Sequence, residues 1–207
     1  MATFAKSEVL RRKLIDAAGA TFAAVGYEAA TVRQITDLAR ANVAAINYHF
    51  GDKRQLYRAV LKAINDRVVA LLEQNCCAEL PEERLYQFVH SILQAESGHQ
   101  YPWAYQLMAR EVAGMQQEQA DLLAEAVRPL HDFAEKIVAD LMRAPGNNAE
   151  VRTISSLLIT LCVNRLPQFR LDLRLYPEMQ LSELTLEKLS EQICQFVLAG
   201  IGSLSHA

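Results

Sequence analysis

Residues 31–60 carry the pattern that most constrains this chain, because two short helical segments around a tight turn run directly into a third capped helix. Thr31 followed by Gln34 is a capping box, in which each side chain bonds an exposed backbone N–H at the start of a helix. The residues Arg40-Ala41-Asn42 then break the pattern, and the last of them is a suitable cap for a second helix that runs to about Tyr48. A connection of about three residues is the length that a helix-turn-helix unit requires.

A helix-turn-helix unit places its second helix in the major groove of DNA, while neighbouring groups hold the phosphates. Asp52 with Gln55 repeats the capping pattern, which puts Lys53 in the first turn of the next helix. There the ammonium, the helix dipole and free N–H groups can share one phosphate. The alternative is that Tyr48 and His49 belong to the core and that Lys53 is a solvated surface charge. The candidate DNA-binding residues are Thr31, Arg33, Arg40, Asn42, Val43, Ala45, Asn47, Tyr48, His49 and Lys53.

The segment from Leu14 to Val60, about a quarter of the chain, resembles the DNA-binding domain of the TetR family of transcriptional regulators. Two positions depart from the family pattern, since Arg40 stands where the family usually has Gly and Asn47 where it usually has an aromatic residue. A left-handed backbone at Arg40 would cost roughly 1 kcal/mol or more. Either the turn is built differently here, or Arg40 is tolerated because it reaches a phosphate. The matching residues are LIDAA from Leu14, Phe22, Gly26-Tyr27, Thr31-Val32, Ile35, Ala39, Tyr48-His49-Phe50, Lys53 and Leu56.

The charges are unevenly distributed along the chain, with a basic N-terminal part, the head, and an acidic remainder, the body. The 207 residues are 51% hydrophobic and 22% charged, which is typical of globular proteins. Residues 1–58 hold nine Lys or Arg against five Asp or Glu, whereas residues 59–207 hold twelve against nineteen. A local excess of positive charge attracts phosphate. We therefore expect a DNA-binding domain at 1–58 and an effector-binding and dimerisation domain at 59–207.

The N-terminus and the apolar segments of the sequence indicate the cellular compartment of the protein. The N-terminus lacks the apolar core of a signal peptide, and no stretch reaches the roughly 18 unbroken apolar residues of a membrane helix. We expect a cytoplasmic protein with no membrane partner. The four cysteines are expected to stay reduced in that compartment.

Helical periodicity continues through the whole chain, with no strand pattern and no internal repeat, so the expected fold is all-α. A three-helix head would be joined by a long helix to a larger helical regulatory and dimerisation domain. The expected helices cover residues 7–25, 31–39, 42–48, 53–74, 82–96, 102–117, 119–143, 149–166 and 185–204.

The last two predicted helices carry more apolar surface than a peripheral position allows. Two such helices per chain can build a four-helix interface with a second copy. The alternative is that both close the core of the monomer. The TetR resemblance implies homodimerisation through the final two helices. The two stripes comprise Val151, Ile154, Leu157, Leu158, Leu161 and Cys162, and then Leu186, Leu189, Ile193, Phe196, Val197, Gly200, Ile201 and Leu204.

The body shows no pattern of an enzyme. It has no Gly-rich phosphate loop, no nucleophile elbow and no His pair at metal-binding spacing, so we expect no catalysis, no metal and no cofactor. The pair Cys76-Cys77 is the remaining candidate for redox or metal sensing. Adjacent cysteines rarely form an unstrained disulfide, and two thiols alone make a weak metal site. Cys162 and Cys194 lie on the apolar stripes and are expected to be core.

The segment Tyr101–Glu111 concentrates aromatic, thioether and polar groups, which describes either a small-molecule pocket or an ordinary core. Together with residues 156–170 it resembles the regulatory domain of the CecR-like branch of TetR regulators, which implies a ligand-responsive domain. The candidate effector-binding residues are Trp103, Leu107, Met108, Arg110, Glu111, Met115, His131, Arg165 and Phe169.

These features favour a homodimeric repressor that binds a palindromic double-stranded DNA operator and responds to a small-molecule effector of unknown identity. A ligand-independent helical DNA-binding or activating protein is the second hypothesis. A helical interaction module without DNA binding is the third. Operator binding separates the third from the others, and loss of that binding when ligand is added separates the first two.

Overall fold

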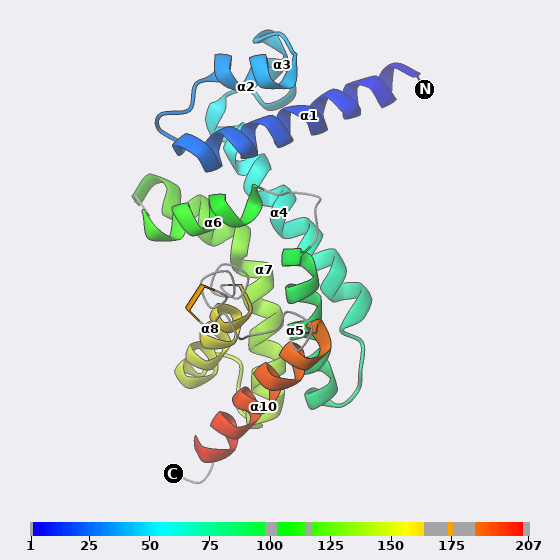
Figure 1. The fold of residues 1–207 in the computed structure, drawn as a ribbon, viewed down its shortest axis with the longest axis vertical. Helices are drawn as coiled ribbons and strands as arrows, with labels where there is room; N and C mark the ends of the chain where they lie inside the picture. The colour runs from blue at the N-terminus through cyan, green and yellow to red at the C-terminus, as the bar shows by residue number, and fades with distance from the viewer. Residues whose placement is uncertain (1, 98–102, 115–116, 164–173, 176–184, 205–207) are drawn as a thin grey trace. The chain divides into compact units, whose positions relative to one another are not determined.

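The computed structural model describes residues 2–97, 103–114, 117–163, 174–175 and 185–204 (Figure 1). Every element of regular structure within these ranges is a helix, which confirms the predicted all-α class. None of the described helices is both long enough and apolar enough to cross a bilayer. The helices are α1 (Ala2–Val25), α2 (Val32–Ala39), α3 (Ala44–Phe50), α4 (Lys53–Asn75), α5 (Pro81–Ser97), α6 (Ala104–Ala113), α7 (Gln117–Met142), α8 (Ala149–Val163) and α10 (Leu186–Leu204).

The predicted capping signals set the ends of the first helices. The N–H of Gln34 donates to Thr31 Oγ1 at 3.2 Å, and the N–H of Thr31 donates to Gln34 Oε1 at 2.9 Å, so the capping box is complete. The N–H of Gln55 donates to Asp52 Oδ1 at 2.7 Å at the start of α4. Gly26 follows α1 with a φ of 84°, a left-handed conformation that glycine adopts without a steric penalty.

Two helices end on an arginine in the left-handed conformation. Arg40 follows α2 with φ 51°, and Arg143 follows α7 with the same φ. In each case the next residue, Ala41 or Ala144, closes a six-residue loop by donating its N–H to the carbonyl oxygen five residues earlier, at 2.9 and 3.0 Å. This is the Schellman motif, in which glycine is the usual left-handed residue. The turn between α2 and α3 therefore has the backbone that glycine usually supplies, with Arg40 in its place.

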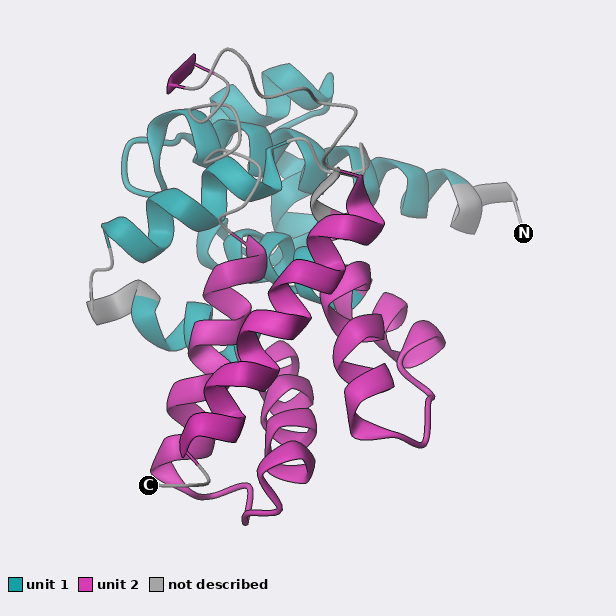
Figure 2. Ribbon diagram, turned by 60° about the horizontal axis from the view of Figure 1, so that its bottom comes forward, with its two compact units in different colours: residues 1–66, 99–127 teal, residues 67–98, 128–207 magenta. Residues whose placement is uncertain are grey.

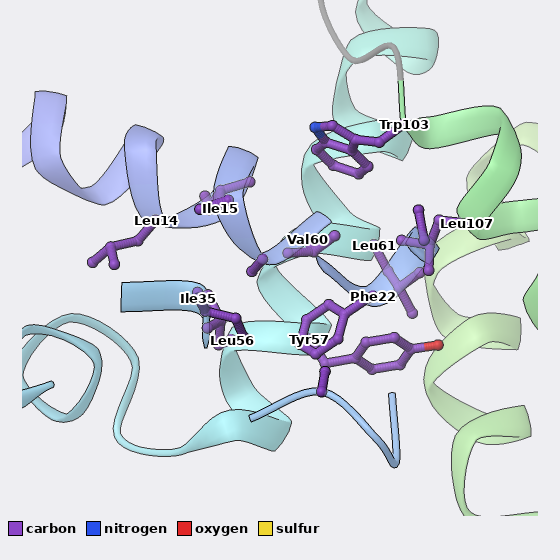
Figure 3. Packing of buried hydrophobic residues seen from close by; sticks show 14 of the residues in the cluster. Leu14, Ile15, Phe22, Ile35, Leu56, Tyr57, Val60, Leu61, Trp103 and Leu107 are labelled. Carbon is purple, nitrogen blue, oxygen red and sulfur yellow. The ribbon is translucent and has the colours of Figure 1, made fainter. Parts of the chain in front are cut away.

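The chain folds into two compact units, coloured separately in Figure 2. Unit 1 comprises residues 1–66 and 99–127, and it holds α1, α2, α3, the first half of α4, α6 and the start of α7. Its core joins the head to α6, since Phe22 of α1 and Tyr57 of α4 share one apolar cluster with Trp103 and Leu107 (Figure 3).

Unit 2 comprises residues 67–98 and 128–207, and its helices include α5, α8 and α10. Here α5 packs against both α8 and α10. Leu85 and Phe88 of α5 lie in its apolar core with Leu158 of α8 and Val197 of α10. The helices α4 and α7 continue from one unit into the other. The division of function at residue 58 remains a prediction, because it concerns roles and not packing.

The two left-handed arginines give a stability prediction. Replacing Arg40 or Arg143 by glycine should raise the free energy of unfolding by about 1 kcal/mol each, since the Cβ penalty of the left-handed region is removed. Urea unfolding followed by circular dichroism measures the change. Arg40→Ala and Arg143→Ala keep the Cβ and should show no such gain. A glycine variant no more stable than its alanine counterpart would contradict this account of the turn.

Candidate functional site

The helices α2 and α3 bury one side in the head and expose the other. Ile35 and Ile46 are fully buried in the core of unit 1. On the outer side Tyr48 is 82% exposed and Val43 is 47% exposed. Both side chains are therefore available for contact with a partner.

All ten predicted DNA-binding residues lie on α2, on α3, in their flanking turns or at the start of α4. The side chains of Ala45, His49 and Lys53 are half-buried, and the other seven are exposed. Thr31 and Asn42 also act as caps, because Thr31 caps α2 and Asn42 Oδ1 accepts the N–H of Ala44 at 2.9 Å. The structure brings the ten together, and their contacts with DNA remain a prediction.

Lys53 is held by residues 26–28, the first part of the loop between α1 and α2, which we call the bridge. Its ammonium lies 4.5 Å from the ring centroid of Tyr27, a cation–π contact, and donates to the carbonyl oxygen of Glu28 at 3.3 Å. An ammonium has three donors, so this geometry leaves capacity for a phosphate oxygen. Sequence reasoning found Tyr27 only as a family match and missed its contact with Lys53.

A groove of about 530 Å³ lies between α1 and the end of α2. Lys13 and Arg40 both line it, so the groove carries two cationic side chains beside the turn of the helix-turn-helix unit. Asp16 lines it as well, with one carboxylate oxygen buried and no hydrogen-bond partner for it among the described residues. Burial raises the pKa of Asp16, and the nearby charge of Arg12 partly opposes that rise. None of the predicted effector-binding residues lines this groove.

Trp103 and Leu107, predicted to bind an effector, lie in the core of unit 1. The indole of Trp103 packs so closely on α1 that a methyl group on Gly19 would overlap it. Leu107 is fully buried and Trp103 is 8% exposed. The structure therefore uses both side chains to pack α6 against the head.

Glu111 is a buried carboxylate with a specific partner. The hydroxyl of Tyr57, itself fully buried, donates to Glu111 Oε2 at 2.5 Å. Burial of Tyr57 and this hydrogen bond raise the pKa of the phenol far above its ordinary value, so Tyr57 stays a neutral donor. Sequence reasoning missed Tyr57, although a hydroxyl on the buried stripe of α4 requires a partner.

The other predicted effector-binding residues that the structure describes belong to different units. Met108 packs at the edge of the unit 1 core, and the Arg110 side chain lies near Gly26. His131 belongs to unit 2 and is half-buried. Effector binding by this set remains a prediction. Three of its members, Met115, Arg165 and Phe169, lie outside the described residues.

The cysteines in the described part of the chain are free thiols. Burial raises the pKa of Cys76 to about 11, which keeps the thiol protonated and weakly reactive. Cys77 is exposed, whereas Cys162 and Cys194 are buried in the core of unit 2, as predicted. Among the described side chains no three His, Cys, Asp or Glu residues gather as metal ligands.

The predicted stripes of α8 and α10 each divide into a buried and an exposed part. Leu158 of α8 and Val197 of α10 are buried in unit 2. The residues just before them in sequence face outward, since Leu157 is 58% exposed and Phe196 is 70% exposed. A Cβ added to Gly200, one helical turn after Phe196, would meet no atom within 4 Å. Both helices thus contribute to the core of their own chain and also present exposed apolar surface.

Comparison with known proteins identifies both parts of the chain. Residues 14–60 match the family described as bacterial regulatory proteins, tetR family. Residues 81–201, more than half of the chain, match the family described as HTH-type transcriptional dual regulator CecR, C-terminal domain. The HTH-type transcriptional repressor AcnR of Corynebacterium glutamicum is 33% identical over 70 residues, which cover 34% of this chain and 37% of AcnR. The match thus spans little more than a third of that relative.

Solved structures share the fold. The fatty acid degradation regulator FadR from Bacillus halodurans superposes with a TM-score of 0.70 at 17% identity, covering 92% of this chain and 95% of FadR. The ketosteroid transcriptional regulator KstR2 of Mycobacterium tuberculosis gives 0.61 at 19% identity, covering 92% and 93%. With both sequence families matched and the helix-turn-helix head in place, the chain belongs to the TetR family of DNA-binding transcriptional regulators, with a C-terminal domain of the CecR type.

Proposed function

We propose that this regulator is a repressor that binds a palindromic operator as a homodimer and releases it when a small molecule binds. The exposed face of α2 and α3 carries the DNA-binding part of this proposal. Tyr48, 82% exposed, has too little packing in the head for a core role. The name of AcnR, a repressor similar over 70 residues, supports repression.

Dimerisation is supported by the exposed parts of α8 and α10. Phe196, Gly200 and Leu204 follow one another at four-residue spacing, so they share one face of α10. An aromatic group beside a bare glycine allows close packing against a second copy of the same face. A dimer would place its two recognition helices, one α3 from each copy, in successive major grooves. Such a dimer requires a palindromic operator.

The ligand response rests on the CecR-type body and on the continuity of α4 from unit 1 into unit 2. A ligand shifts DNA affinity only by its different affinity for two conformations. The alternative function is ligand-independent DNA binding, and it is favoured by the packing of Trp103 and Leu107 into a core. Release of operator by a ligand decides between the two. Selecting bound fragments from genomic DNA with the full-length protein supplies that operator.

The phosphate contacts predict a change in salt dependence. Lys53→Ala and Arg40→Gly should each lower the magnitude of the slope of log affinity against log salt by about 1 unit, on every DNA sequence alike. Arg143→Gly makes the same backbone change in unit 2 and should keep the wild-type slope. Fluorescence anisotropy over a salt series measures the slopes. Equal slopes for Arg40→Gly and Arg143→Gly would remove Arg40 from the interface.

The exposed face of α10 predicts the oligomeric state. Phe196→Glu should destabilise the dimer by roughly 3 to 5 kcal/mol, because the new carboxylate would be buried without a partner. It should leave the monomer folded, because Phe196 is exposed there. Sedimentation should show monomers, with operator affinity falling at the same protein concentration. Leu80→Glu changes a side chain that is 58% exposed outside this face and should remain dimeric. A dimeric Phe196→Glu variant would place the interface elsewhere.

Ligand response predicts reciprocal binding. A compound that weakens operator binding about tenfold must bind about tenfold more weakly to the DNA complex, a coupling of about 1.4 kcal/mol. Titrating the compound into free protein and into the operator complex by calorimetry measures both affinities. The fluorescence of Trp103, the single tryptophan, should change if the ligand alters its contact with α1. If no compound in a broad apolar and aromatic library releases the operator, the ligand-independent function is the better one.

A further inference from the structure

A chain of contacts in unit 1 joins a carboxylate on α6 to the cation at the start of α4. The hydroxyl of Tyr57 donates to Glu111. The ring centroid of Tyr57 lies 4.8 Å from that of Tyr27, whose ring carries the Lys53 ammonium at 4.5 Å. All four residues belong to the same compact unit.

The bridge of residues 26–28 contacts α6 at a second point. The Arg110 side chain lies 3.7 to 3.9 Å from the position of a Cβ on Gly26. Two neighbouring residues of α6 are therefore linked to the bridge. Arg110 lies beside Gly26, and Glu111 reaches Tyr27 through Tyr57. The bridge in turn holds Lys53 by the Tyr27 ring and by the carbonyl oxygen of Glu28.

Close packing makes this chain of contacts sensitive to the hydrogen bond. Tyr57 and Phe22 are fully buried, and their rings meet edge to face with centroids 5.3 Å apart (Figure 3). The bond at the hydroxyl end fixes the Tyr57 ring, and in a close-packed core a ring tilts only when its neighbours move. The aromatic neighbour of Tyr57 on the side of the bridge is Tyr27, which supports Lys53.

We infer that Glu111 is a positioning residue for DNA binding, which sets the place of the Lys53 ammonium through Tyr57 and Tyr27 and thereby the strength of a phosphate contact. This inference rests on the proposed role of Lys53 in binding phosphate. It gives Glu111 a role toward DNA and makes α6 part of the DNA-binding machinery.

The test compares variants of the hydrogen-bonded pair on one duplex that the full-length wild-type protein selects from a random-sequence pool. Tyr57→Phe and Glu111→Ala should weaken binding about threefold to tenfold. They should also lower the magnitude of the salt slope toward that of Lys53→Ala, by up to about 1 unit. Glu111→Gln keeps an oxygen acceptor for the phenol and should keep the wild-type slope.

A matched control uses another polar link between α4 and the segment 99–127. Arg58 of α4 forms an ion pair with Glu125 of α7, and Arg58 is the residue next to Tyr57. Glu125→Ala removes one carboxylate, as Glu111→Ala does, but breaks no contact with the bridge. Its salt slope should equal that of the wild type. A slope that falls equally in both variants would trace the effect to charge and overturn the inference.

A loss of folded protein must be separated from a loss of positioning. Tyr57→Phe leaves the Glu111 carboxylate buried without its donor, which destabilises the fold, whereas replacing both partners by apolar groups is nearly neutral. The double variant Tyr57→Phe with Glu111→Met should therefore regain stability in urea while keeping the reduced salt slope. Recovery of the wild-type slope in that double variant would show that the pair acts only through stability.

The outcome for Lys53 separates this inference from the function on which it rests. An unchanged slope in Lys53→Ala overturns the phosphate role of Lys53 and the positioning role of Glu111 with it. A reduced slope in Lys53→Ala, with wild-type slopes in Tyr57→Phe and Glu111→Ala, overturns the positioning role alone. If both hold, Glu111→Ala should cause no further loss of slope in the Lys53→Ala background, since the two changes then act on one contact.

Discussion

The burial of one face of α1 is the interaction on which the rest of unit 1 depends. Leu14, Ala18 and Phe22 are fully buried on that face. The same helix packs against α2, the first helix of the helix-turn-helix unit, and against α6, which comes later in the sequence. A head built of α1 and the two short helices α2 and α3 offers little apolar surface of its own, and small cores are marginal in stability. By sharing a core with α6, the head gains stability and becomes sensitive to the position of α6.

The local signals of the sequence predicted local structure well. The caps at Thr31 and Asp52 and the stop at Gly26 depend on residues within one turn of each other, and each appears in the fold. The bond between Tyr57 and Glu111 spans 54 positions, and no local pattern encodes it. For the same reason the periodicity around Trp103 did not distinguish a ligand pocket from a core.

The apolar stripes of α8 and α10 show a second limit of periodicity. The spacing of Ile193, Phe196, Val197 and Gly200 predicted one apolar face, yet the packing of α5 against α10 divides it. Ile193 and Val197 are buried within the chain, while Phe196 is exposed. Adjacent positions on a helix differ by about 100° in direction, so a broad stripe can serve two neighbours. Which part faces which neighbour depends on tertiary packing.

The contact between Gly19 and Trp103 has a consequence for how this sequence can change over time. Any side chain at position 19 would occupy space that the indole now fills. A larger residue there becomes acceptable only after position 103 has become smaller, and the intermediate with one change alone carries either an overlap or a void. The residues at positions 19 and 103 should therefore vary together among relatives. Substitutions in α1 and at the start of α6 would then be coupled during evolution.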